Sequence, residues 1–272
     1  MSSIIEDLIA RKIFNNRGEE TIEVDVITAS GFGRAAAPAG KSRGKAEVVY
    51  YPQGGVEQAI KKVDDLIAPE LAGLNADFQE EIDNTLHEID GTTDFKNIGG
   101  NTAFAISIAN AEAAANSHNL LLFQFLGGNA ANSLPYPLGN CISGGQHARG
   151  KSPDIQEYLA LPHGAESFLE AQTANTQIHK KIGDLLKKKS TSFNGGKSDE
   201  GAWIANIDTI DAFEVMAKAC EEVGNELDFE CGFGIDVAAS SFWKPKEEKY
   251  IYESEGKKRD TAEQLEFMLE LI

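Results

Sequence analysis

The sequence is poor in cysteine and in basic residues, and it contains no long apolar run. Its 272 residues include 3 cysteines and 25 lysines and arginines against 43 acids, so the formal net charge is −18. This charge opposes nucleic acid binding, because few cations are available to replace phosphate counterions. No stretch approaches the roughly 18 apolar residues of a membrane-spanning helix. We therefore expect no nucleic acid partner and no membrane span.

The three cysteines, Cys141, Cys220 and Cys231, lie far apart in the sequence and form no C-x-x-C pair. Neither a disulfide framework nor a zinc site is predicted, and we expect three reduced packing residues. The start of the chain, MSSIIEDLIARKIF, carries acids where a signal peptide would have a basic end. A cytoplasmic protein is therefore expected.

The first half of the chain changes from strand-like to helical periodicity. Alternating apolar and polar residues predict an antiparallel meander with strands over 21–28, 32–37 and 46–51. Apolar residues at helical spacing then predict helices over 56–67, 78–89 and 101–117. Three strands followed by three helices indicate an α+β domain over residues 1–128.

The second half, residues 129–272, alternates strand and helix. Asp208 is predicted to cap a helix, and Thr261 to begin the last one, with Gln264 completing its capping box. Such alternation predicts a parallel α/β sheet or barrel with a site at the carboxyl ends of its strands. A barrel needs roughly 250 residues. We therefore expect an incomplete barrel.

Polar residues crowd between two apolar segments in residues 140–165, NCISGGQHARGKSPDIQEYLALPHGA. The pair Gly144-Gly145 permits backbone angles closed to other residues, so His147 is predicted to sit on a sharp turn. His147 could donate a hydrogen bond to a phosphate or a carboxylate. The alternative is a purely structural hydrogen bond.

Two glutamates are candidates for acid and base chemistry. Gln156 and Glu157 open the apolar run 158–161, which is predicted to be a buried strand, and a poorly hydrated carboxylate there needs a partner or a chemical role. Glu200 lies in the glycine-containing loop SDEG, which would let it move as an acid or base. A solvent-facing loop acid is the alternative for Glu200.

Two further residues are candidate metal ligands. Asp236 ends an apolar strand and suits Mg²⁺, which takes one or two carboxylates plus water and substrate oxygens. A helix cap or a loop hydrogen bond is the alternative. Ser42 lies in the small basic loop 39–44, AGKSRG, which could close over a ligand or be a plain exposed turn.

In its motifs and their order, the chain resembles the amino-terminal two thirds of enolases, the phosphopyruvate hydratases. The opening blocks NRG with TIEVDV, PAGKSRG, and KNIGGN with AFAIS resemble DSRGNPTVEV, PSGASTG and KSNLGANAILGVS. The later blocks SGGQHARG, IQEYLALPHGAESF, SDEGAWIAN and GIDVAASSFW resemble NGGxHAGN, LQEFMIxPxGAxSF, GDEGGFAPN and GxDxAASEFY.

The resemblance implies a meander-and-helix lid domain on a TIM-like barrel that interconverts 2-phosphoglycerate and phosphoenolpyruvate with Mg²⁺. By motif it implies these roles: Glu200 as acid at the departing hydroxyl with Glu157 beside it, Gln156 and His147 as substrate-binding residues, Asp236 as ligand of the first Mg²⁺, and Ser42 as contributor to the second. A homodimer through the lid domain is the family expectation.

The chain also departs from the family pattern. Arg149-Gly150 replace asparagine and glycine, Lys41 and Arg43 stand in the lid loop, and the SIEDP, GDD and SHRSGE segments and the base lysine are missing. We therefore expect no turnover by this chain alone. Two hypotheses follow. In the first, the chain is an enolase or part of one, and activity needs a longer product or a second chain that supplies a complementing carboxy-terminal half. In the second, the chain is a non-catalytic interaction protein on an enolase-like scaffold.

Overall fold

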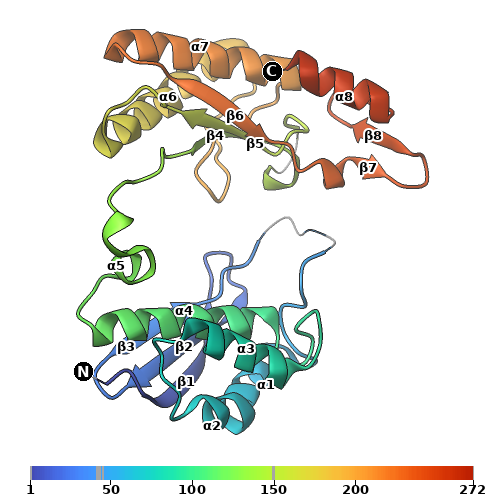
Figure 1. Ribbon diagram of the computed structural model, residues 1–272. Helices are drawn as coiled ribbons and strands as arrows, with labels where there is room; N and C mark the ends of the chain where they lie inside the picture. Colours follow the sequence, from blue (N-terminus) through green and yellow to red (C-terminus); the bar gives the residue numbers. More distant parts are fainter. Residues whose placement is uncertain (1, 41–43, 45, 149–150, 272) are drawn as a thin grey trace. The chain divides into compact units, whose positions relative to one another are not determined.

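The computed structural model describes residues 2–40, 44, 46–148 and 151–271, in two compact units, residues 1–133 and 134–272 (Figure 1). The candidate metal ligand Ser42 and the divergent Lys41, Arg43 and Arg149-Gly150 lie outside the described residues. Within the described ranges, no helix combines the length and the apolar character that a membrane crossing needs.

The first unit packs helix α4 against a three-stranded antiparallel sheet of order β1-β2-β3 (Figure 1). Its elements are β1 (Ile5–Phe14), β2 (Glu20–Thr28), β3 (Phe32–Ala36), α1 (Gly55–Lys62), the π-helix η1 (Val63–Ile67), α2 (Ala68–Leu71), α3 (Gln79–Asp90), α4 (Gly100–Ser117), α5 (Leu122–Gly127) and the 3₁₀ turn η2 (Gly128–Ala130). The alanine-rich α4 approaches β3 so closely that a Cβ on Gly33 would lie 2.0 Å from the Ala109 carbonyl oxygen. This contact is possible only because both partners are small.

The predicted meander is right in kind but wrong in one strand. Residues 46–51 are not a strand: the Val49 amide and carbonyl pair with the Asp94 carbonyl and the Gly100 amide, beside the start of α4. The third strand is β1, which the alternation did not predict because a bulge between Ile5 and Asp7 breaks its period. Charged side chains on the solvent side of β1 obscure the pattern further.

The second unit contains two small sheets with helices beside them. Its elements are β4 (Gly139–Ser143), η3 (Gly145–His147), β5 (Glu157–Leu161), α6 (Phe168–Lys189), α7 (Thr209–Leu227), β6 (Gly232–Asp236), η4 (Ala239–Ser241), β7 (Trp243–Lys244), β8 (Lys249–Tyr252), β9 (Lys257–Arg259) and α8 (Thr261–Glu270). Asp208 caps α7 as predicted, since its carboxylate accepts the Asp211 amide. Buried Tyr158 and Ala160 of β5 share one core with α6 and α7.

The parallel sheet expected here is wrong: β4, β5 and β6 pair antiparallel, in that order. The predicted alternation of strand and helix is interrupted, because both α6 and α7 lie between β5 and β6 in the sequence. Two helices return the chain to the end of the sheet from which β5 departs. In the described part of the chain, β6 pairs only with β5 and leaves the sheet open at that edge.

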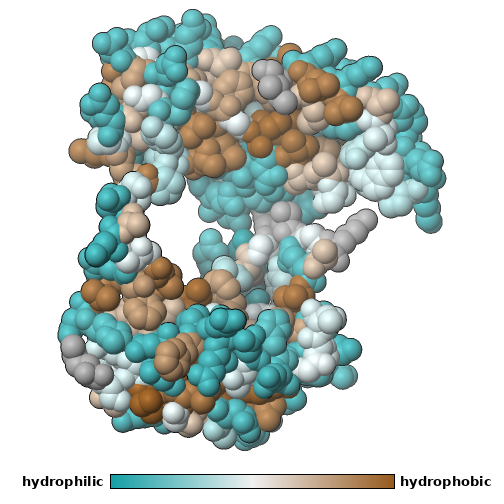
Figure 2. All heavy atoms as spheres, viewed as in Figure 1, coloured by the Kyte–Doolittle hydropathy of each residue, from teal (hydrophilic) through white to brown (hydrophobic). Residues whose placement is uncertain are grey.

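The last helix is capped one residue earlier than predicted. Asp260 accepts the Ala262 and Glu263 amides, while Glu263, not Gln264, completes the box. Gln264 is buried instead, and it donates to the Tyr252 hydroxyl. Figure 2 shows an apolar surface where β6 and α8 lie in Figure 1. Leu265 and Leu269 of α8 are exposed.

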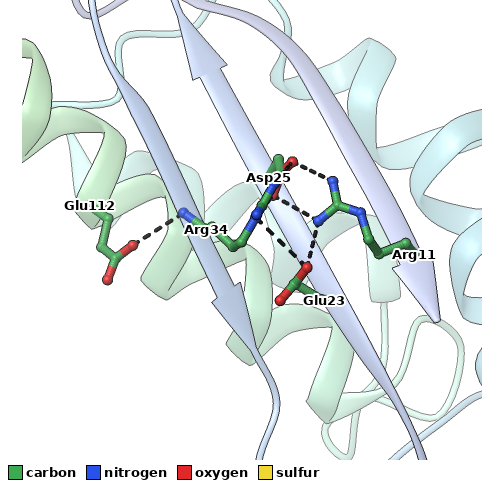
Figure 3. A network of polar contacts seen from close by, with 5 residues as sticks. All are labelled: Arg11, Glu23, Asp25, Arg34 and Glu112. Carbon is green, nitrogen blue, oxygen red and sulfur yellow. Dashed lines mark hydrogen bonds and ion pairs between the residues drawn. The ribbon is translucent and has the colours of Figure 1, made fainter. Parts of the chain in front are cut away.

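A charged network covers the face of the first sheet that points away from the core (Figure 3). Asp25 of β2 is buried, and both Arg11 of β1 and Arg34 of β3 bind its carboxylate through two nitrogens each. Arg11 also reaches Glu23 at 2.6 Å, and the Arg34 amide donates to Glu112 of α4. The guanidinium of Arg34, aided by Arg11, holds the pKa of Asp25 well below its usual range. The network ties the three strands together across their outer face.

Replacing Asp25 with Asn should lower the free energy of unfolding of the first unit by about 2–4 kcal/mol at pH 7, because two guanidinium groups lose their counter-charge. A depressed carboxyl pKa contributes stability above the unfolded pKa near 3.9, and that stability is lost as pH falls toward the folded pKa. The difference in the free energy of unfolding between variant and parent should therefore shrink from pH 7 to pH 3. Hydrogen exchange of the β2 amides measures this free energy.

Glu20→Gln is the matched control, because it removes a carboxylate from the exposed end of the same strand, where its partner is the half-exposed Lys12. Exposed pairs contribute at most about 1 kcal/mol. An Asp25→Asn variant as stable as this control at pH 7 would contradict the role given to the network.

Candidate functional site

The site is built on the antiparallel register of the second sheet. Glu157 is the first residue of β5 and Asp236 the last of β6, and their Cα atoms are paired, with Ser143 of β4 paired to Glu157 on the other side. Paired residues project to the same face. Because Tyr158 points into the helical core, Glu157 points to the opposite face of the sheet. Asp236 lies at the carboxyl end of its strand, and Glu157 lies at the amino end of β5, the strand that it was predicted to open.

The glycine pair Gly144-Gly145 forms the sharp turn predicted before His147, and this turn places His147 beside Glu157. Gly145 has a φ of 48°, in the left-handed region that favours glycine. Gly144 is needed for a different reason, since a Cβ there would lie 2.2 Å from the Pro153 carbonyl oxygen. The chain therefore turns from β4 into η3, and the His147 ring is buried.

Glu200 completes a three-residue cluster from a loop that joins α6 to α7. The Nδ1 atom of His147 lies 3.2 Å from Oε1 of Glu157 and 3.7 Å from Oε2 of Glu200. The ligand atoms of the three residues lie within 4.8 Å of one another, close enough to share a cation. Asn140 of β4 fixes Glu200 by donating from Nδ2 to Oε2 at 2.8 Å.

The environment makes Glu157 a weak acid. Burial raises its pKa to about 7, and the negative charges of Glu200 and Asp236 and a hydrogen bond with Glu200 act in the same direction. Two carboxylates this close do not both ionise easily, so one proton is retained near neutral pH. The pair can therefore store a proton and release it within the physiological range.

Three of the six predicted site residues, His147, Glu157 and Glu200, form one cluster. Asp236 lies beside them on the next strand, and its Oδ1 accepts the Ala238 amide at 3.0 Å, the loop hydrogen bond expected as its alternative role. Gln156 is buried immediately before Glu157. Asn140 was not predicted as a site residue, because nothing in its local sequence signals a contact with a loop 60 residues away.

Comparison with known proteins identifies both units. Residues 5–126 match the family model of the enolase N-terminal domain, and residues 131–270 match that of the enolase C-terminal TIM barrel domain. The chain is 53% identical over 272 residues to a protein named enolase from Methanothermobacter thermautotrophicus, covering 100% of this chain and 65% of the relative. Enolases from Methanosphaera stadtmanae and Pyrobaculum aerophilum are 50% and 46% identical, with 100% and 98% of this chain and 66% and 65% of the relatives covered. The chain thus spans about two thirds of the length of these relatives.

Replacing Glu157 with Gln should stabilise the second unit at alkaline pH. A carboxyl group whose pKa rises from near 4.3 in the unfolded chain to about 7 in the folded protein opposes folding as it ionises. Glutamine removes this cost, so the free energy of unfolding of Glu157→Gln should exceed that of the parent by roughly 1–3 kcal/mol at pH 8. Near pH 4 the two proteins should be equally stable. Urea unfolding followed by tryptophan fluorescence reports this unit, since Trp203 and Trp243 both lie in it.

Glu166→Gln provides the control, because Glu166 is exposed in the same unit and the substitution changes the charge equally. Its effect should be small and nearly independent of pH. A Glu157→Gln variant less stable than the parent at pH 8 would show that the ionised carboxylate is stabilised by its surroundings, contrary to this account.

Proposed function

The chain belongs to the enolase family, and we propose that it forms part of the active site of a phosphopyruvate hydratase, which reversibly dehydrates 2-phosphoglycerate to phosphoenolpyruvate in glycolysis and gluconeogenesis. The observation that carries this proposal is the cluster of His147, Glu157 and Glu200, with Asp236 in the adjacent strand. These four side chains come from separate segments of the sequence and meet at one end of one sheet.

The acid chemistry is assigned to the glutamate pair. Loss of a hydroxyl group as water needs a proton at the departing oxygen, and an acid with a pKa near the working pH delivers it best. The pair retains one proton near neutral pH, because the pKa of Glu157 is about 7. We assign delivery to Glu200, which is half-exposed on its loop, and proton storage to Glu157, which is less exposed. Gln156 and His147 are assigned to substrate binding.

Asp236 fits the Mg²⁺ site that the family implies. It is exposed at a strand end, and one of its oxygens accepts the Ala238 amide, an arrangement that orients the carboxylate. Mg²⁺ binds through one or two carboxylates and otherwise keeps water and substrate oxygens. Bound there, Mg²⁺ would stabilise negative charge on the substrate carboxylate as the enolate develops. A contribution of Ser42 to a second ion stays a prediction.

We propose that this chain turns over only with further enolase residues. The relatives are longer, and the family's base lysine and the carboxylates of its SIEDP and GDD segments do not occur in these 272 residues. The open edge of β6 offers a place for additional strands. A cytoplasmic location is supported by the cysteines, since Cys141, Cys220 and Cys231 are free. A homodimer, or a complex with a carboxy-terminal enolase half, is the proposed assembly.

Complementation tests this function. The chain is coexpressed with the part of the Methanothermobacter thermautotrophicus enolase that it does not match, and phosphoenolpyruvate formation from 2-phosphoglycerate is followed with Mg²⁺ present. Turnover is expected in the copurified complex and not in the chain alone. Glu200→Gln in the complex should lower kcat by about 10²–10⁴, the range for loss of a general acid.

Glu166→Gln in the same complex should leave kcat unchanged. A complex that forms but shows no turnover would contradict the proposed activity and favour a non-catalytic interaction protein on this scaffold. Turnover by the isolated chain would contradict the requirement for further residues.

Metal binding has a separate test. Mn²⁺ titrated into the complex as a paramagnetic substitute for Mg²⁺ should broaden the amide resonances of Ile235 and Ala238, and Mg²⁺ should reverse the effect. Asp236→Asn should weaken the apparent affinity at least tenfold, because it removes the charged ligand. Equal broadening in parent and variant would assign the ion to other residues.

A further inference from the structure

The loop that carries Glu200 is held at several points, although many of its residues are exposed. Its turn is closed by the Ser198 amide, which donates to the Ala202 carbonyl at 2.8 Å, and by the Gly201 amide, which donates to Ser198. Gly201 adopts a φ of 85° there. These local bonds shape the turn but do not fix it to the rest of the unit.

The backbone of Trp203 attaches the loop to the free edge of β4. Its amide donates to the Cys141 carbonyl and its carbonyl accepts the Ser143 amide, both at 2.9 Å, so this residue forms an isolated parallel bridge with Ile142 of β4. The same strand carries Asn140, whose side chain binds Glu200. Glu200 therefore lies three residues from a backbone anchor.

The indole ring of Trp203 is held in turn by α6 and the loop. It stacks on His179 with a centroid distance of 4.8 Å and an interplanar angle of 21°. Its Nε1 donates to the His179 carbonyl at 2.8 Å, while Lys197 lies 4.3 Å over the ring. Gly183, one turn further along α6, makes room for the ring, since a Cβ there would lie 2.9 Å from Cζ2.

The His179 ring completes the attachment by binding the loop next to the acid. Its Nε2 lies 3.0 Å from the carbonyl oxygen of Gly201, the residue that follows Glu200. Burial lowers the pKa of His179, so the neutral ring, with one N–H to donate, is the form present near pH 7. A hydrogen bond at this carbonyl restricts rotation of the peptide between Gly201 and Ala202, one residue after Glu200.

We propose that His179 and Trp203 are positioning residues, which clamp the loop so that the Glu200 carboxylate faces Glu157 and His147. This inference rests on the proposed function for its catalytic consequence, since Glu200 is the assigned acid. Both residues act through the backbone of residues 201–203, which follow Glu200 directly.

The side-chain amide of Asn140 reports the position of Glu200 without any need for activity. In the ¹⁵N-labelled 272-residue chain, Glu200→Ala defines the resonance of Asn140 Nδ2 without its carboxylate partner. His179→Ala should move this resonance most of the way toward that reference. His179→Gln, whose amide can still donate to the Gly201 carbonyl, should stay near the parent, and so should Lys180→Ala, which alters an exposed neighbour on α6.

Loss of packing alone would lower Tm in all α6 variants in proportion to the atoms removed and would leave the Asn140 resonance in place. An unchanged resonance in His179→Ala overturns the proposal. If that variant does not fold, Trp203→Phe keeps an aromatic ring at this position but removes the donor to the His179 carbonyl. An Asn140 resonance identical to the parent's in Trp203→Phe then overturns the proposal instead.

In the complemented enzyme, His179→Ala should lower kcat by about 10- to 100-fold and change KM by less than about threefold, because misplacement of a reacting group by about 1 Å has costs of this size. His179→Gln should recover most of the loss. The resonance needs no turnover, so an inactive complex would count against the proposed function while the positioning role is judged separately. An unchanged kcat in His179→Ala, with turnover present, overturns the positioning role.

Discussion

Crowding of carboxylates at one end of an antiparallel sheet is the constraint on which the second unit depends. The register pairs Glu157 with Asp236, and the loop after α6 adds Glu200, so three negative groups meet on one face. Water would normally screen them, but Glu157 is largely buried. The protein satisfies this constraint by leaving one proton on the pair and by placing the Nδ1 atom of His147 within 3.2 Å of Glu157.

The two units use buried acids in opposite ways. In the first unit, Asp25 is buried with two arginines across the sheet, which depress its pKa and make the charge stabilising. In the second, Glu157 is buried beside other acids, which raises its pKa and makes ionisation costly. Opposed shifts of this kind separate a structural ion pair from a group suited to proton transfer. The stability lost when Glu157 ionises is consistent with a site whose geometry serves a reaction rather than the stability of the fold.

The sequence predicted what local patterns determine. The Asp208 cap, the strand that begins at Glu157 and the helices of both units follow from nearest neighbours and periodicity. The direction of β6 relative to β5 does not, because it depends on whether one helix or two return the chain, and two do. The contacts of Asn140 with Glu200 and of His179 with Gly201 join residues 60 and 22 positions apart, and no local pattern encodes them. Enolase motifs located the acids without revealing what holds them.

The central claim is that Glu157 and Glu200 share a proton near neutral pH. A ¹³C NMR titration of the side-chain carboxyl of Glu157 tests it most directly, in the parent chain and in Glu200→Gln. The account predicts a pKa of about 7 in the parent and a lower value in the variant, since one of the neighbouring charges is gone. A Glu157 pKa near the ordinary value of about 4.3 in both proteins would contradict it.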